Sequence, residues 1–303
     1  PENIIIVDSS AITDIDIQNL NLVKYIKSSH ANQPYQRYIG YLVSSNNILV
    51  YFDDDMRVID DQCFEKILSL YDDQNVVGVQ PNFAYKHDFF NRKMPLSKTR
   101  QLAKKNIIFR YLKNLSGNPD LENGKFWLAG VRGNKPDNKK TMEWFNGPVF
   151  SVKKEFFYDD FNFSLFGLYE NKIGKAEDAI LGFTLSRLGD IIYFDEELFT
   201  HDDQDDSSYS IDFVSHGMRV AHSRLYLSFE YARLSKTSIM AAFLHFNLYI
   251  FGRITSMLIN QFIDYKVSRS QILVGYLKGY LKALADIKKL IFFDNGANWN
   301  KEA

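Results

Sequence analysis

The sequence predicts an α/β fold: a mixed, mainly parallel sheet flanked by helices, followed by a helical extension at the C-terminal end. Short apolar runs of strand length alternate with segments of helical spacing up to about residue 200, which is typical of a layered α/β domain. From about residue 211 the strand signals fade, and apolar-rich helical segments continue to about residue 293. We therefore expect an α/β domain over residues 1–210 and a helical region over residues 211–303.

Composition and charge exclude several classes of protein. The 303 residues are 46% hydrophobic and 24% charged, which excludes collagen-like, low-complexity and mostly disordered chains. The 36 Lys and Arg residues nearly balance the 37 Asp and Glu residues, so no overall basic excess indicates nucleic acid as a partner. The single cysteine, Cys63, excludes an internal disulfide and a cysteine-based metal site, and it fits a reducing compartment.

The first residues predict a short buried strand rather than a secretion signal. They contain no basic segment and no long apolar stretch. Because the domain begins directly on such a strand, we expect a further strand and helix upstream of Pro1.

Strand and helix signals alternate along the first eighty or so residues. Residues 4–7 are an apolar run followed by the turn-like Asp8-Ser-Ser, and Ile48–Phe52 are five consecutive apolar residues that lead directly into Asp53-Asp54-Asp55. The other expected elements are a strand over residues 22–26, a helix over 35–44, a helix over 61–71 and a strand over 75–80.

The next part of the chain begins with a polar, irregular stretch. A helix is expected near residues 97–115 and a loop at residues 130–140, before strand character returns over 145–152. Residues 176–188 predict a helix, because Glu177 and Asp178 stand at its start and Gly189 follows its end. A strand over residues 191–194 and an acidic loop over 201–206 complete this part.

Two long segments dominate the helical region. Residues 237–263 are strongly apolar, but polar side chains interrupt them and argue against a membrane span, which needs about 20 nearly uninterrupted apolar residues. The interrupting residues are His245, Asn247, Arg253, Asn260 and Gln261. Residues 268–290 predict an amphipathic basic helix, which either packs on the domain or lies on an anionic membrane surface.

The aspartate triplet after Ile48–Phe52 is a candidate cation site. In an extended chain, alternation places Asp53 and Asp55 on one side and Asp54 on the other. Two carboxylates on one side can hold a hard divalent cation, which in turn can hold a diphosphate. The alternative is a solvated acidic turn or a helix cap.

Two further features have both a chemical and a structural interpretation. Glu177 and Asp178 either supply a general base that takes a proton from an attacking hydroxyl, or complement the charge of a helix start. His201, at the end of a β-like stretch, either joins carboxylates in a metal site, where imidazole favours manganese over magnesium, or is a surface residue.

Taken in order, these motifs resemble family 2 glycosyltransferases, which have the GT-A fold. The resemblance covers roughly residues 1–205. The matching stretches are residues 4–9, 37–40, 48–58, 145–157 and 174–201. The family's usual opening segment, a strand followed by Pro-x-Tyr-Asn and a helix, does not occur in this sequence.

On the donor side, the resemblance implies contacts with a nucleotide diphosphate. Asp8 matches the carboxylate that hydrogen-bonds the base, and Arg37 matches an arginine that faces the diphosphate, although Tyr38 replaces the usual asparagine after it. Asp53 matches the aspartate near the ribose and the metal, and Asp54 is expected to join the nucleotide contacts.

For the metal and the reaction, the resemblance implies a second set of residues. Asp55, Asp53 and His201 would hold Mn²⁺ or Mg²⁺, Asp178 would act as the catalytic base, and Glu177 would bind or orient the acceptor. The residues that would shape the sugar pocket are Trp144, Asn146 and Gly147.

The function that the resemblance implies is metal-dependent, inverting transfer of a sugar from a nucleotide-diphosphate donor, expected to be UDP-linked, to a hydroxyl of a glycan or lipid-linked acceptor. Such an enzyme would work in bacterial surface polysaccharide synthesis, in the cytoplasm or peripherally on the inner face of the membrane. The alternatives are a metal-dependent sugar nucleotidyltransferase and a non-catalytic saccharide-binding module. The sequence leaves the oligomeric state open.

Overall fold

A central mixed sheet organises the computed structural model, which describes residues 3–12, 15–85, 106, 121–159, 161–201, 212–263 and 265–291. The strand order is β3-β9-β5-β10-β4, and β8 pairs with β10 beside this path. The strands are β3 (Ile48–Phe52), β4 (Met56–Val58), β5 (Val76–Tyr85), β8 (Thr141–Met142), β9 (Val149–Lys153) and β10 (Asp190–His201).

The strand directions show why the sheet is mixed. β10 pairs with β5 in parallel, whereas β9 is antiparallel to both β3 and β5, so β3, β5 and β10 all run in the same direction. β4 and β8 pair with β10 in the antiparallel sense. The predicted α/β class, with helices flanking a mixed sheet, is confirmed.

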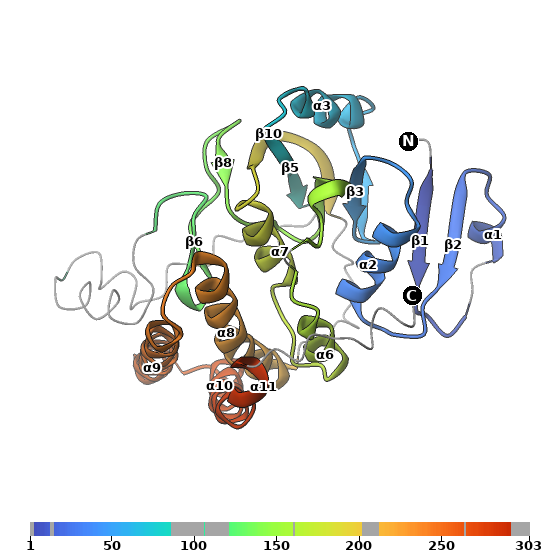
Figure 1. Ribbon diagram of the computed structural model, residues 1–303. Helices are drawn as coiled ribbons and strands as arrows, with labels where there is room; N and C mark the ends of the chain where they lie inside the picture. Colours follow the sequence, from blue (N-terminus) through green and yellow to red (C-terminus); the bar gives the residue numbers. More distant parts are fainter. Residues whose placement is uncertain are drawn as a thin grey trace.

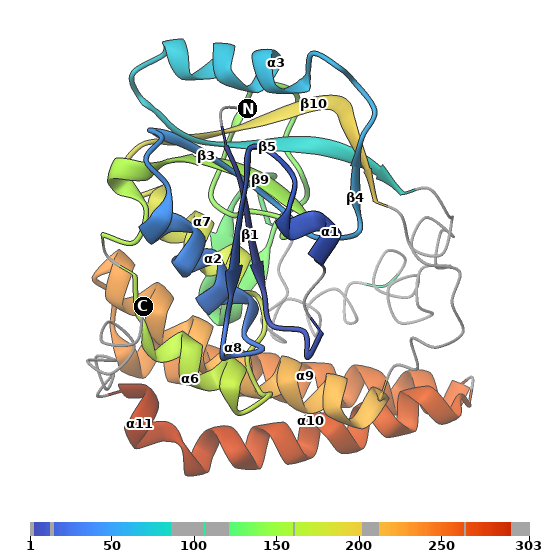
Figure 2. The same cartoon turned by 90° about the vertical axis from the view of Figure 1, so that its right-hand side faces the viewer.

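Helices cover both faces of this sheet (Figures 1 and 2). Helix α3 (Cys63–Ser69) lies on one face, and α2 (Gln33–Val43) and α7 (Glu177–Leu185) lie on the other. The buried apolar residues accordingly form two clusters. Alternate residues of β9 point to opposite faces, since Val149 belongs to the smaller cluster under α3 and Phe150 to the larger one.

Smaller elements surround the sheet. On the side of β3, β1 (Ile4–Asp8) and β2 (Val23–Lys27) form a parallel pair beside α1 (Ile15–Gln18). β6 (Phe126–Trp127) and β7 (Val131–Arg132) form an antiparallel pair. Helix α6 (Ser164–Glu170) and the 3₁₀ turns are the remaining short elements of the described α/β part, the turns being Leu70–Asp72, Leu128–Gly130 and Lys154–Phe156.

The helical extension packs against the helices of the sheet domain. It consists of α8 (Phe213–Ser235), α9 (Ile239–Ile263), α10 (Val267–Ala285) and α11 (Ile287–Ile291). α8 lies next to α7, α9 contacts α8 and the 3₁₀ turn at Leu128–Gly130, and α10 and α11 lie furthest from the sheet (Figure 2). One apolar cluster includes Phe183 of α7 and Phe229 of α8, so the extension shares its core with the rest of the chain. The division into domains at residue 210 stays a prediction.

Glycines allow α8 and α10 to approach each other closely. A Cβ atom on Gly275 would lie 2.2 Å from the Val214 carbonyl oxygen, and one on Gly217 would lie 2.4 Å from the Ile272 carbonyl oxygen. Because these distances are shorter than any real Cβ contact, the helices could not pack in this way with larger residues.

Most of the expected elements are confirmed, with shifted ends. The expected strands over residues 75–80 and 191–194 extend to Tyr85 and His201, and the one over 145–152 begins at Val149. α6 and β4 were not expected. The expected helix near residues 97–115 and the acidic loop after His201 lie outside the described residues, except for residue 106. Among the described helices, α9 alone has the length and composition to cross a membrane, and 28% of its most apolar window is buried.

Candidate active site

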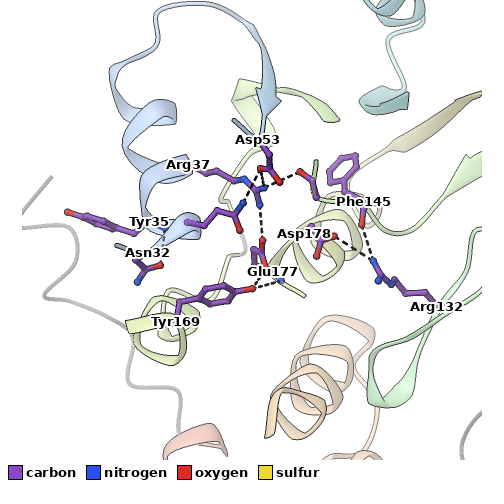
Figure 3. Close-up of polar contacts among 11 residues, drawn as sticks. Asn32, Tyr35, Arg37, Asp53, Arg132, Phe145, Tyr169, Glu177 and Asp178 are labelled. Atoms are coloured by element: carbon purple, nitrogen blue, oxygen red, sulfur yellow. Dashed lines mark hydrogen bonds and ion pairs between the residues drawn. The ribbon is translucent and has the colours of Figure 1, made fainter. Parts of the chain in front are cut away.

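Arg37 forms the centre of a buried polar site between α2, β3 and α7 (Figure 3). Asn32 caps α2 by accepting a hydrogen bond from the backbone N–H of Tyr35. Arg37 lies one helical turn after Gln33, the first residue of the helix. The Arg37 side chain is 8% exposed. Its Nη2 donates to Asp53 Oδ1 at 2.9 Å and its Nη1 donates to Glu177 Oε1 at 2.9 Å. One guanidinium therefore joins a carboxylate after β3 to a carboxylate at the start of α7.

Asp53 begins a tight turn between β3 and β4. The Met56 amide donates to the Asp53 carbonyl at 3.2 Å, so the expectation of an extended chain through the triplet is wrong. The turn exposes Asp54, while Asp53 and Asp55 are half-buried. Gln33, one turn before Arg37, also donates to Asp53 Oδ1, at 3.0 Å. Burial raises the pKa of Asp53 and Asp55 raises it further, whereas Arg37 opposes both effects.

Asp55 and His201 meet at the edge of the sheet. In the β4–β10 pairing, His201 stands opposite Met56, so it lies close to Asp55, the residue before Met56. His201 Nε2 and Asp55 Oδ2 are 3.2 Å apart. A carboxylate oxygen beside an imidazole nitrogen is a donor set that suits Mn²⁺. Within the described ranges, no group of three or more His, Cys, Asp or Glu residues is arranged to hold a metal ion.

Glu177 lies at the start of α7, where a sharp change of backbone direction precedes the helix. Ala176 has φ of 66°, a left-handed conformation that is costly for a residue other than glycine. Glu177 accepts hydrogen bonds from Arg37 and from the Tyr169 hydroxyl of α6. Burial and the neighbouring Asp178 raise the pKa of Glu177, and Arg37 opposes this rise.

Asp178 lies beside the loop that leads into β9. Gly147 is so close that a Cβ atom on it would lie 3.5 Å from Asp178 Oδ2. The Gly147 carbonyl also accepts a hydrogen bond from Arg37 at 3.0 Å, so this loop contacts both charged groups. Arg132 Nη1 lies 3.6 Å from Asp178 Oδ2 and approaches from β7 (Figure 3).

Trp144 and Asn146 belong to the same loop. Trp144 is 6% exposed, and the Arg132 guanidinium lies 4.9 Å from its ring centroid. The backbone N–H of Asn146 donates a hydrogen bond to Gln80 Oε1 at 2.7 Å, which connects the loop to β5. A Cβ atom on Gly182 of α7 would lie 2.7 Å from Trp144, so the loop also packs closely on that helix.

Asp8 lies apart from Arg37, at the end of β1. Lys27 Nζ donates to Asp8 Oδ2 at 2.9 Å, and Tyr25 and Ser10 also donate to the same carboxylate. These hydrogen bonds, first of all the one from Lys27, hold the pKa of Asp8 far below its usual range. The Gln36 side chain of α2 donates to the carbonyl oxygen of Val7, the residue before Asp8, at 2.8 Å. Helix α2 therefore contacts both the end of β1 and the Arg37 site.

The structure brings most of the predicted residues together. The Arg37 site collects Asp53, Glu177 and Gly147, with Asp178 beside Gly147, while Asp55 and His201 form an adjacent pair. Sequence reasoning missed three contributors, namely Gln33, Arg132 and Tyr169. The spacing of four between Gln33 and Arg37 was a usable signal, because such residues share one face of a helix.

No known protein family and no curated protein matches the sequence. Among solved structures, a match is the mannosyltransferase PcManGT from Pyrobaculum calidifontis in complex with GDP-Man and Mn²⁺. Its identity is 11% and its TM-score 0.45, and the match covers 94% of this chain and 79% of that chain.

Proposed function

We propose that this protein is an inverting glycosyltransferase of the GT-A type, which moves a sugar from a nucleotide-diphosphate donor to a hydroxyl group. One observation carries the proposal: a single buried guanidinium, Arg37, is bonded to both Asp53 and Glu177, and Asp178 is the next residue. The carboxylates expected at the donor phosphates and the carboxylate expected as the base therefore belong to one site, as a transfer between two bound substrates requires.

In this proposal Asp178 takes the proton. The acceptor oxygen forms a bond to the anomeric carbon while the bond from that carbon to the diphosphate oxygen breaks. The hydroxyl proton passes to the Asp178 carboxylate, which must be ionised to receive it. Because attack comes from the face opposite the leaving group, the configuration at the anomeric carbon is inverted. Glu177 holds Arg37 and Tyr169 and so orients the helix start.

Asp55 and His201 are the residues that would hold a divalent cation, with Asp53 next to them. A bound Mn²⁺ or Mg²⁺ supplies neutralisation of the charge that grows on a leaving diphosphate. Asp8 is the candidate for the nucleotide base, for which we propose uracil, and Asp54 is exposed at the same turn as Asp53. The loop from Trp144 to Gly147 is the candidate sugar pocket.

A screen of nucleotide-diphosphate sugars tests the function. With Mn²⁺ present, we expect one donor to release free nucleoside diphosphate, slowly into water and faster with a suitable acceptor. Excess EDTA is expected to abolish the release, and added Mn²⁺ or Mg²⁺ to restore it. Full activity in EDTA contradicts the role of the metal.

Release of pyrophosphate from a nucleoside triphosphate and a sugar phosphate would identify a nucleotidyltransferase, and binding without turnover would identify a saccharide-binding module.

We further propose that the protein works at a membrane surface on a glycan or lipid-linked acceptor, as in bacterial surface polysaccharide synthesis. Helix α9 has its polar side facing inward: Asn247 accepts a hydrogen bond from Tyr280 of α10 at 2.7 Å, and Arg253 interacts with Tyr276. Its outward side is apolar, with five side chains more than half exposed. They are Met240 (72%), Leu244 (59%), Phe251 (72%), Leu258 (51%) and Phe262 (95%).

Charge indicates which surface would cover this face. Residues 236–291 contain 8 Lys and Arg residues against 2 Asp residues, whereas the whole chain has a net charge of −1. Lys278 and Lys282 are exposed on α10, where Lys282 pairs with Asp286 at 2.8 Å. An exposed apolar stripe on a positively charged helical region is typical of a helix that lies in the interface of an anionic bilayer.

Vesicle sedimentation tests the membrane contact. We expect the protein to sediment with phosphatidylglycerol-containing vesicles, and the variant Phe251→Ser/Phe262→Ser to lose at least tenfold in affinity, since each buried aromatic ring contributes roughly 1.5–3 kcal/mol. The matched control is Leu42→Ser/Leu68→Ser, which changes exposed apolar residues of α2 and α3 and should sediment like the parent. Equal sedimentation of both variants contradicts the proposal. Self-association that only the α9 variant loses would instead identify a second copy of the chain as the partner.

A further inference from the structure

Four basic side chains gather near Asp178, and one of them, Arg132, approaches it from the side opposite Arg37 (Figure 3). They come from β7, from the residue before the left-handed Ala176, and from α8, which are three separate parts of the chain. They are Arg132, Lys175, Arg219 and Arg224, and we refer to them as the cation cluster. Arg219 contacts Gly174, the residue before Lys175, and Arg224 contacts Gly130, two residues before Arg132. Burial, and then Arg219, Arg224 and Arg132, lower the pKa of Lys175 to about 8.

Backbone carbonyls hold two members of the cation cluster in place. Arg219 Nε donates to the Gly174 carbonyl at 3.1 Å. Arg224 Nη1 donates to the Ala129 carbonyl at 3.0 Å and also to the Gly130 carbonyl. These neutral partners orient the guanidinium groups but leave their positive charges uncompensated. The arrangement is therefore fixed before any ligand arrives.

Carboxylates are scarce around the cation cluster. Arg132 lies 3.6 Å from Asp178, but across the described residues no carboxylate lies within 4 Å of the other three members. The nearest titratable partner of Lys175 is a histidine, with His216 Nδ1 lying 3.5 Å from Lys175 Nζ. Burial, and then Lys175 and Arg219, lower the pKa of His216, so repulsion extends to this residue as well. An anion bound here would relieve the repulsion.

Trp144 provides an independent indication that a ligand binds here. Its Nε1 is buried, and no residue in the described part of the chain accepts a hydrogen bond from it. A buried donor without an acceptor costs about 1–3 kcal/mol, so such groups are rare unless a bound molecule supplies the acceptor. The Trp144 ring lies against the Arg132 guanidinium, which also lies 3.6 Å from Asp178, so the indole adjoins the cation cluster at Arg132.

We propose that the cation cluster binds a phosphate or diphosphate group carried by the acceptor. The inference deepens the proposed function, on which it rests, because it gives the acceptor a chemical class. The donor diphosphate belongs on the other side of Asp178, with Asp53 and Asp55. A phosphoryl group matches three uncompensated cations better than a single carboxylate does, and arginine forks bind its oxygens in pairs. The phosphate could belong to a prenyl diphosphate lipid or to a phosphorylated glycan.

Calorimetric titration at pH 7 in EDTA, without donor, tests the site. The probes are geranyl diphosphate, glucose 1-phosphate and uncharged geraniol. We expect at least one phosphorylated probe to bind, and the variant Lys175→Gln/Arg219→Gln to bind it at least tenfold more weakly. Tighter binding of geranyl diphosphate assigns the phosphate to a lipid, and tighter binding of glucose 1-phosphate assigns it to a glycan. If neither phosphorylated probe binds, or if geraniol binds equally well, the inference is overturned.

Two further variants test whether the cation cluster itself binds the phosphate. The control variant Lys24→Gln/Arg187→Gln removes the same two charges at exposed positions and should bind like the parent. Asp178→Asn should bind the probe at least as tightly, because it removes a negative charge from the edge of the site. If the cluster variant binds normally while the parent transfers sugar, the cluster inference fails alone. If the cluster variant loses binding while the parent transfers no sugar, the proposed function fails alone.

Discussion

Replacing Asp178 with asparagine is expected to lower the transfer rate by about a hundredfold or more, because general-base catalysis typically contributes 10²–10⁴. Asparagine has nearly the same shape, so it can still lie beside Gly147 and near Arg132. Its amide cannot take a proton from the acceptor hydroxyl. We therefore expect kcat to fall while KM for the donor stays close to that of the parent, as measured by release of nucleoside diphosphate in the presence of acceptor.

The matched control is Asp137→Asn, which changes an exposed aspartate whose partner is Lys140. It should leave kcat unchanged. An unchanged kcat in Asp178→Asn would remove Asp178 from the mechanism. A rise in donor KM with unchanged kcat would instead give Asp178 a binding role, which the proposed mechanism does not allow.

Several carboxylates that sequence reasoning found share one property: they stand at the end or the start of an element that a local pattern defines. Asp8 and Asp53 follow apolar runs, and Asp178 opens a helix that Gly189 follows. Because the carboxyl ends of parallel strands in an α/β sheet surround its ligand site, Asp53 after β3 and His201 at the end of β10 could be predicted to lie at the same edge. Residues 4–7 and Ile48–Phe52 form strands as predicted, but the expectation that the first strand is buried is wrong, because Ile4 is exposed and the rest of β1 is half-buried.

What the sequence could not show depends on contacts between distant residues. Tyr169 reaches Glu177 from α6, a short helix whose N-cap residue, Phe163, has no capping side chain. Arg132 reaches Asp178 from a two-residue strand. The turn at Asp53 formed because the chain reverses into β4, and three consecutive aspartates do not distinguish a turn from an extended strand end. The cation cluster likewise exists only after α8 has packed beside α7.

Replacing Arg37 with methionine is expected to destabilise the fold by about 3 kcal/mol, because it leaves two carboxylates without their shared counterion. Asp53 and Glu177 would then face each other, with side-chain exposures of 23% and 11%. Their partial exposure to water limits the loss to the lower end of the range for a broken buried ion pair. Thermal or urea unfolding measures the change. The control is Arg187→Met, which removes an exposed guanidinium that lies over a phenylalanine ring and should cost much less.

The dependence on pH distinguishes lost charge pairing from lost packing. Arg37 opposes the effect of burial on the pKa of Asp53 and Glu177, so its removal raises both values further above those of the unfolded chain. A carboxyl group whose pKa is raised on folding favours the folded state at low pH, and this contribution is lost as pH rises through the folded pKa. Arg37→Met should therefore lie closest to the parent in acid and furthest from it at neutral pH. A loss of unfolding free energy that is the same at every pH would indicate lost packing only.

The double variant Arg37→Met/Glu177→Gln should recover part of the lost stability at neutral pH, because one of the two carboxylates that repel each other is then absent. No recovery would mean that Arg37 does not act by joining these two carboxylates.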